Sequence, residues 1–323
     1  MMRHTNHRSP ITRRYAGTAG NFLFTLDQHE GSPAWVKSVA GGEVKGVLVS
    51  EPTNIDYPAI KHLVGLEVQP ITVELAMGVT SPIFDWIQAA WSRRFSRRSG
   101  AIVHANFQHE ILFEQAFQDA LVVQTTFPTL DASDHNPAYL TVKIQPEFVR
   151  LTEERKGNSL WGEHKNNTSK QWCPANFRME LFDLHGRSVD CRGVKKIESF
   201  SIKQHIARLC TGANSVAQIE PTRVEFPNLT ITLNLSGASD FLRWHNEFIT
   251  AGGNRPDDEK QGFIEFLDPS CRNSLMYVDL CRVGIQNLTL EKSESNAAAC
   301  KLCKVELYVE AMELSVTKPT RNR

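Results

Sequence analysis

Short runs in which apolar and polar residues alternate recur along the chain, and they predict β-strands. In residues 70–75, isoleucine, valine and leucine alternate with threonine and glutamate, so one face of the strand would be buried and the other exposed. Similar runs occupy residues 139–144 and 228–233. We therefore expect a mainly β protein.

Two segments instead carry apolar residues at helical spacing. The first follows Ser81-Pro82, a serine that can cap a helix and a proline suited to its first turn, and its apolar residues are Ile83, Trp86, Ile87, Ala90 and Trp91. The second begins at Ser239-Asp240 and ends before Gly252-Gly253, and its apolar stripe is Phe241, Trp244, His245, Phe248 and Ile249. We expect both tryptophans to be core residues.

The order of these elements is repeated within the chain. The strand Asn21–Leu26 has a second version at Asn176–Leu181, and Val36–Val39 is repeated as Val194–Ile197. An offset of 158 (228 − 70) carries Pro70–Leu75 onto Asn228–Leu233. The same offset places Trp86 on Trp244.

The correspondence continues beyond the helices. Gly100–Val103 matches Gly262–Glu265, Ala120–Val123 matches Cys281–Gly284, and Tyr139–Ile144 matches Lys304–Val309. Order is preserved throughout, which favours a duplication over chance.

The repeat predicts two tandem domains, each a β-sandwich or barrel closed on one side by one helix. The predicted segments are a basic flexible arm at 1–19, domain 1 at 20–150, a polar linker at 151–171, domain 2 at 172–314 and a flexible tail at 315–323. A length of 323 residues is what two domains need.

Composition narrows the class of partner. Lys plus Arg and Asp plus Glu number 36 each, so no overall field draws the chain to nucleic acid or to an anionic membrane. No run of 18 apolar residues occurs, and no membrane span is expected. All seven cysteines follow residue 170 without the spacing of a disulfide scaffold, which fits reduced thiols in the cytoplasm.

The candidate chemistry is sparse. Cys300 and Cys303 form a C-x-x-C, but residues three apart in a strand face opposite ways and cannot chelate one ion together. The histidines are scattered, and none has a serine, cysteine or carboxylate at the spacing of a nucleophile–base pair. We predict no catalytic residue, no metal and no cofactor. Gly41-Gly42 lacks the context of a phosphate-binding loop and is predicted to form a hairpin or loop.

Four arginines surround Phe95 at the end of the first predicted helix: Arg93, Arg94, Arg97 and Arg98. Such a cluster can bind phosphates, but it also complements the helix dipole and can pair with acids of a neighbouring subunit. We favour an interface or a solvated face, and expect no sequence-specific binding of nucleic acid.

The repeated order of strands, together with Leu75-Ala76-Met77-Gly78 and Phe84-Asp85-Trp86, resembles the tail-tube proteins of contractile phages and of phage-tail-like injection systems. The closer match lies in Gly20–Arg150, and Trp172–Leu314 matches more loosely. The family's usual member has one domain, a small β-sandwich with a flanking helix, whose rings stack into a hollow tube. The whole chain is similar to tandem two-domain phage tail proteins.

The resemblance implies a structural protein that assembles into a ring or tube segment, as tube, tube initiator or baseplate-hub adaptor. Its partners would be itself, as a trimer or hexamer, and other tube, sheath or baseplate proteins. It would be cytoplasmic and part of a phage-tail-like particle or virion. The candidate assembly surface comprises Gly41, Gly42, Lys45, Glu51, Arg93, Arg94, Arg97 and Arg98.

Two other functions stay open. Tandem β-sandwiches also serve as binding modules for carbohydrate or peptide, which would act as monomers. An enzyme would need a convergent polar pocket, and the sequence indicates none.

Overall fold

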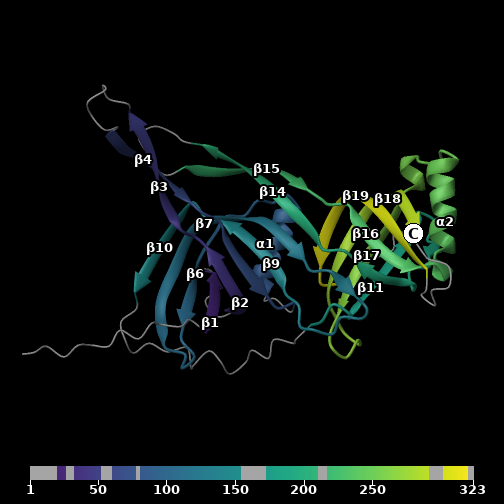
Figure 1. Ribbon diagram of the computed structural model, residues 1–323, viewed down its shortest axis with the longest axis horizontal. Coiled ribbons are helices and arrows are strands. Elements are labelled where there is room, and N and C mark those ends of the chain that lie inside the picture. Colours follow the sequence, from purple (N-terminus) through teal and green to yellow (C-terminus); the bar gives the residue numbers. More distant parts are fainter. Residues whose placement is uncertain are drawn as a thin grey trace, which may run out of the picture.

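The structure is a computed structural model that describes residues 20–26, 33–51, 60–77, 81–153, 172–209, 217–290 and 301–318. The predicted N-terminal arm and most of the predicted linker lie outside these residues. The described chain forms two β units, which we call the N-terminal unit (residues 20–153) and the C-terminal unit (residues 172–318). Figure 1 shows them side by side.

In the N-terminal unit, six strands close into a barrel because β7 pairs with both β6 and β9. In order around the barrel these strands are β7 (Ile111–Phe127), β6 (Arg98–Ala105), β1 (Asn21–Leu26), β2 (Ala34–Gly41), β5 (Ile71–Leu75) and β9 (Leu140–Gln145). β10 (Phe148–Glu153) also pairs with β7, so residues 151–153 of the predicted linker are strand. Alternate residues of β5 are buried, as their pattern predicts.

In the C-terminal unit, the sheet has eight strands and stays open. Their order is β12 (Ser188–Val189), β11 (Phe177–Phe182), β17 (Lys260–Leu267), β18 (Ser274–Leu290), β19 (Leu302–Ser315), β16 (Leu229–Asn234), β13 (Val194–Ile197) and β8 (Leu130–Asp131). The last strand comes from the N-terminal unit, where Leu130 pairs with Ile197.

Each unit has one α-helix, α1 (Ser81–Trp91) and α2 (Ser239–His245), so the prediction of a mainly β protein with one helix per domain is confirmed. Trp86 and Trp244 are both buried, as predicted. Trp86 donates a hydrogen bond of 2.7 Å from its indole nitrogen to the carbonyl of Ser96. α1 lies between the units, since the Gln88 amide also donates to the carbonyl of Leu314.

The second helix begins at Ser239, as predicted, and Ala238 occupies the cap position without a side-chain hydrogen bond. The α-helix ends at His245, and a π-helical turn (Asn246–Thr250) carries the chain to the predicted stop. The turn inserts extra backbone before Gly252, whose φ of 74° suits glycine. Short 3₁₀ turns lie at Leu235–Gly237 and Pro256–Asp258.

The registers of the two units correspond. Val36 opposes Leu75 and Val194 opposes Leu233, with a bulge after the valine in both pairs. A bulge likewise precedes Gly100 in β6 and Gly262 in β17. These are the residues that the sequence repeat matches.

Two of the matches predicted from the sequence repeat differ by two residues from the correspondence seen in the structure. Measured from the bulges, Ala120 corresponds to Val283, because they oppose Arg98 and Lys260. Leu140 corresponds to Cys303, because Leu140 opposes Leu75 in β5 and Cys303 opposes Leu233 in β16. Leu75 and Leu233 are the last apolar residues of these two strands. Alternation has a period of two, so a shift by two leaves the same side chains inward and the pattern cannot detect it.

A hairpin joins the units. β14 (Phe200–Leu209) pairs with β15 (Gln218–Glu225) and, along its other edge, with β7 of the N-terminal unit. The rings of Phe127 and Phe200 stack there, with centroids 4.8 Å apart, and both side chains are buried. One continuous apolar core therefore runs through both units.

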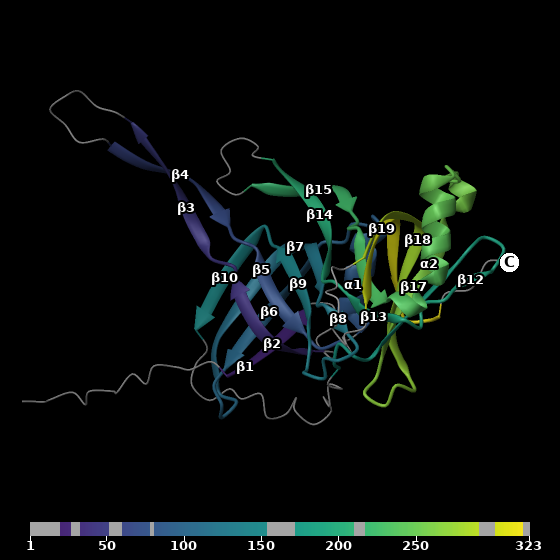
Figure 2. The same cartoon turned by 45° about the vertical axis from the view of Figure 1, so that its right-hand side comes forward.

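A second hairpin stands away from the N-terminal barrel (Figures 1 and 2). It consists of β3 (Val44–Glu51) and β4 (Ile60–Val68), which form a separate two-stranded sheet. Every residue of β3 is exposed.

Candidate functional site

Half of the predicted assembly residues lie on the β3–β4 hairpin or lead into it. Gly41 and Gly42 have φ of 92° and 82° and direct the chain from β2 into β3, so the predicted loop is confirmed. A side chain at Gly41 would collide with the carbonyl oxygen of Pro70. Lys45 and Glu51 are exposed on β3.

Apolar side chains on this hairpin are exposed to an unusual degree. Leu48 is 61% exposed and Leu63 is 63% exposed, although they oppose each other in the hairpin. The other exposed large apolar residues of the hairpin are Val44, Val47, Val49, Ile60 and Val64. An isolated two-stranded sheet is marginally stable in water, and exposed apolar clusters of this kind mark interaction sites.

The four arginines of the predicted cluster do not form one surface. Arg93, with φ of 58°, and Arg94 are exposed just after α1. Arg98 is half-buried at the start of β6. Arg97 binds the C-terminal unit: it donates to Glu220 at 2.9 Å and to the carbonyl of Ile219, and lies 3.6 Å from Glu147. It thus holds β15 to the N-terminal barrel within the chain.

The β14–β15 hairpin, which Arg97 holds, is an element that the sequence analysis missed. Lys203 opposes Glu225 in the β14–β15 hairpin, just as Lys45 opposes Glu67 in the β3–β4 hairpin. The offset of 158 residues that relates the repeated strands also relates these pairs. Extending that offset past Val39 would have shown that each domain carries the same hairpin.

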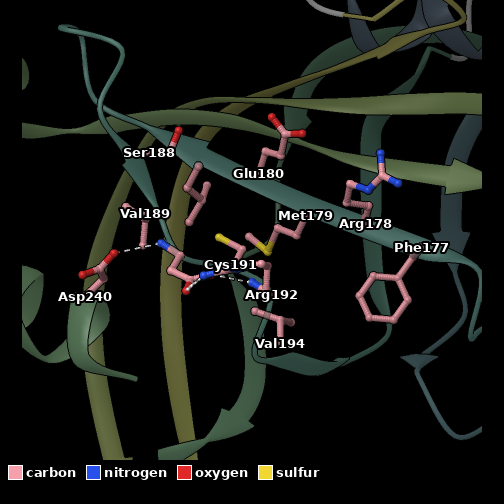
Figure 3. A pocket seen from close by; sticks show the side chains of 12 residues that line it. Phe177, Arg178, Met179, Glu180, Ser188, Val189, Cys191, Arg192, Val194 and Asp240 are labelled. Carbon is pink, nitrogen blue, oxygen red and sulfur yellow. Dashed lines mark hydrogen bonds and ion pairs between the residues drawn. The ribbon is translucent and has the colours of Figure 1, made fainter. Parts of the chain in front are cut away.

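The C-terminal unit has an opening where the N-terminal barrel is closed. In the N-terminal unit Phe22 opposes Val36, which joins β1 to β2. Their counterparts Phe177 and Val194 do not pair, and they line a hollow of about 780 Å³. β11 pairs instead with the short β12, where Leu181 opposes Val189. Figure 3 shows the side chains that line this hollow, which come from β11, from residues 188–194 and from Asp240 of α2.

The polar groups around the hollow are mutually paired. The backbone N–H of Asp190 donates to the Asp240 carboxylate at 3.0 Å, and Arg192 donates two hydrogen bonds, of 2.9 and 2.8 Å, to the Asp190 carboxylate. Hydrogen bonds from Arg192 lower the pKa of Asp190 to about 2. Burial raises the pKa of the neighbouring Cys191 thiol to about 12, so this thiol stays protonated.

The described residues contain no group of three or more His, Cys, Asp or Glu side chains that could hold a metal ion. Of the C-x-x-C pair, Cys303 is buried in β19 and Cys300 lies outside the described residues. Among the histidines, His104 stacks on Phe113 at 4.1 Å, and burial lowers its pKa. In the part of the chain that the structure describes, no helix is long and apolar enough to cross a membrane.

No family model and no curated protein matches the sequence. Among the solved structures that resemble this chain are components of contractile injection systems. A chain of the anti-feeding prophage baseplate is 10% identical, with 43% of this chain and 91% of that chain covered and a TM-score of 0.35. A chain of the PVC sheath–tube complex of an extracellular contractile injection system is 12% identical, with 43% and 89% covered and a TM-score of 0.35. Hcp1 from Flavobacterium johnsoniae is 10% identical, with 43% and 95% covered and a TM-score of 0.24.

Proposed function

We propose that this chain is a structural protein that assembles with copies of itself into a ring or tube segment of a contractile tail or injection system. The observation that carries the proposal is the β3–β4 hairpin, which stands off the barrel and exposes apolar residues along both strands. A second chain would cover these residues and remove the exposed strand edge.

The chain would be an internal duplication, with domain 1 in the N-terminal unit and domain 2 in the C-terminal unit. The matching bulges of β2 and β13 and of β6 and β17 support it. Two similar units per chain would let three chains fill six positions of a ring, or six chains form a ring two units thick. The sequence resemblance to tail-tube proteins supports a place in the tube or baseplate, next to sheath or baseplate proteins.

Self-assembly is tested by measuring the mass of the full-length chain in solution over a range of concentrations. We expect a ring-sized oligomer, and a wild-type chain that stays monomeric throughout would contradict the proposal. Replacing Leu48 and Leu63 by lysine should yield a folded monomer, because both side chains are already exposed. The matched control replaces Leu151 and Leu184, which are 66% and 46% exposed outside the hairpin, and should leave the oligomer intact.

The hollow beside β11 favours a second candidate, a binding module for an extended peptide. One edge of β11 pairs with β17. On the other edge, residues Phe177 to Glu180 have no strand partner among the described residues, so a peptide could add as a strand there. A peptide or glycan array probed with the Leu48→Lys/Leu63→Lys monomer separates the two functions. Specific binding by that monomer, without any wild-type oligomer, would favour the binding module.

A further inference from the structure

We propose that the β3–β4 hairpin of one chain adds to the edge of β18 of a second copy, near residues 287–290, and repeats the joint that β14 makes with β7 inside each chain. The proposal rests on the self-assembly proposed above, and it names the two surfaces that meet and their register.

The internal joint supplies the template. Phe200 of β14 opposes Phe127 of β7, and Lys203 opposes Gln124. Side chains reinforce the pairing, since the hydroxyls of Thr126 and Ser201 are 2.7 Å apart. β7 therefore accepts β14 on the edge that it no longer shares with β6.

β18 offers the same edge, with which no described strand pairs. β7 pairs with β9 through a bulge between Val122 and Gln124, and β18 pairs with β19 through a bulge between Ile285 and Asn287. Asn287 therefore corresponds to Gln124, and Leu290 corresponds to Phe127. Beyond Val283, β18 pairs with β19 alone among the described strands.

The edges of β7 and β18 differ in how far an equivalent side chain is exposed. Phe127 is fully buried at 0% exposure, whereas Leu290 is 55% exposed. An apolar side chain at this position is thus covered where a hairpin is bound and uncovered where none is bound. Covering Leu290 would remove apolar surface from water, which favours association.

The β3–β4 hairpin has the geometry of the hairpin that fills the internal joint. Val49 opposes His62 in one, and Ala207 opposes Glu220 at the same place in the other. Among the described residues β3 pairs with β4 alone, so its second edge is available. The template then places Lys45 opposite Asn287 and Gly42 opposite Leu290 of the second copy.

An ion pair of the internal joint has a counterpart in the proposed contact, in which the acidic residue lies on the barrel side and the basic residues on the hairpin. Arg97 of the N-terminal unit binds Glu220 of β15 at 2.9 Å. Arg98 corresponds to Lys260, so Glu259 takes the place of Arg97. The offset of 158 residues between the two hairpins puts His62 in the place of Glu220. Lys61 adjoins His62. A carboxylate on one surface would meet the His62 imidazole and the Lys61 ammonium group on the other.

Glu259 has an oxygen available for such a partner. Its side chain is buried, at 8% exposure, and Oε1 accepts a hydrogen bond of 2.9 Å from the Tyr308 hydroxyl. Oε2 has no hydrogen-bond partner among the described residues. A buried carboxylate oxygen without a partner is costly, and Oε2 would turn outward to accept a contact from β4 of a second copy.

The resulting contact joins unlike surfaces, and Figure 1 places the β3–β4 hairpin and β18 on opposite sides of the molecule. Chains would therefore join head to tail, with internal and external joints alternating, and would form a closed ring or a filament. Such a ring of six positions would contain three chains.

Cysteine cross-linking tests the register. A Lys45→Cys chain is mixed with an Asn287→Cys chain and oxidised, with the wild type treated in parallel to measure cross-links of its native cysteines. We expect a covalent heterodimer, since residues opposed in a β ladder lie within the Cα separation that a disulfide spans. A Ser50→Cys chain is the matched control, because Ser50 is exposed further along the same strand and should not cross-link to Asn287→Cys.

A double-mutant cycle tests the ion pair in the full-length oligomer. Glu259→Gln and His62→Ala should each weaken association roughly 10-fold, and the double variant should weaken it little further. An oligomer that forms without the Lys45–Asn287 cross-link would overturn this interface and leave self-assembly standing. A wild-type monomer would overturn both.

Discussion

Asp119 and Arg282 have the same left-handed backbone, with φ of 49° and 53°, at equivalent points of the two longest strands. Each directly precedes a residue, Ala120 or Val283, that pairs across a bulge with the preceding strand. Neither residue is glycine, which adopts a positive φ most readily, so the strand pairing imposes this backbone conformation against the preference of the residues themselves. The bend that results lets both long strands leave one neighbour and pair with another.

Replacing Arg282 tests the strain at this bend. We expect Arg282→Gly to have a free energy of unfolding about 1 kcal/mol higher than Arg282→Ala, because glycine adopts positive φ without the penalty of a Cβ. The Glu310 ion pair at 3.3 Å is lost in both variants and cancels. Urea unfolding measures the difference. Glu313 in β19 lacks a positive φ, so there the glycine variant should be the less stable one.

The stack of Phe127 on Phe200 should contribute strongly to stability, because it lies in the joint between the units. Phe200→Ala would leave a cavity and lower the free energy of unfolding by roughly 3–5 kcal/mol. Guanidinium titration followed by fluorescence and by circular dichroism measures the loss. Phe148→Ala serves as the control, since Phe148 is 39% exposed, and an equal loss in both variants would contradict the importance of the joint.

Asp279 should make stability depend on pH. Burial, followed by repulsion from Glu313, raises the pKa of Asp279 from its ordinary 3.8 to about 6. The folded protein thus binds this proton more tightly than the unfolded chain does. Its contribution to the free energy of unfolding is complete below pH 3.8 and is lost as the pH rises through about 6.

Asp279→Asn should remove this dependence and raise the melting temperature at neutral pH. Melting curves over the same pH range measure both effects. Asp85→Asn is the control, because Asp85 is exposed on α1, and it should keep the wild-type slope. A slope unchanged in Asp279→Asn would assign the dependence to another group.

Cys191 should resist alkylation although it lines the hollow beside β11. Burial raises its thiol pKa to about 12, and the thiolate is the reactive species. The exposed Cys271 should be labelled by iodoacetamide at neutral pH far faster than Cys191. Mass spectrometry of the digested protein measures both rates. Rapid labelling of Cys191 in the folded protein would show that the hollow opens in solution.

Much of the fold follows from local pattern. Alternating residues placed β5 and β16 correctly, and helical spacing placed Trp86 and Trp244 in the core. The repeat also related the first strands of the two units in the right register. It failed by two residues in the long strands, because no side-chain pattern distinguishes positions that face the same way.

The candidate assembly residues stay a prediction, since charge alone does not say which partner a side chain meets. Arg97 was grouped with its neighbours in sequence, yet it binds Glu220 of the other unit. The exposed leucines of the β3–β4 hairpin were missed, because an apolar residue in an alternating strand is normally taken to be buried.

The sequence by itself determined many of the strands and the two helices, because these depend on which side chains avoid water, and it predicts the correspondence of one unit with the other. The tertiary structure alone decided which strand edges meet. In it β7 accepts β14, β1 closes on β2 while β11 stays apart from β13, and β3 and the end of β18 each keep one edge unpaired among the described strands. Strand edges join through backbone N–H and C=O groups, which nearly every residue carries alike, so the side-chain pattern does not specify their partners.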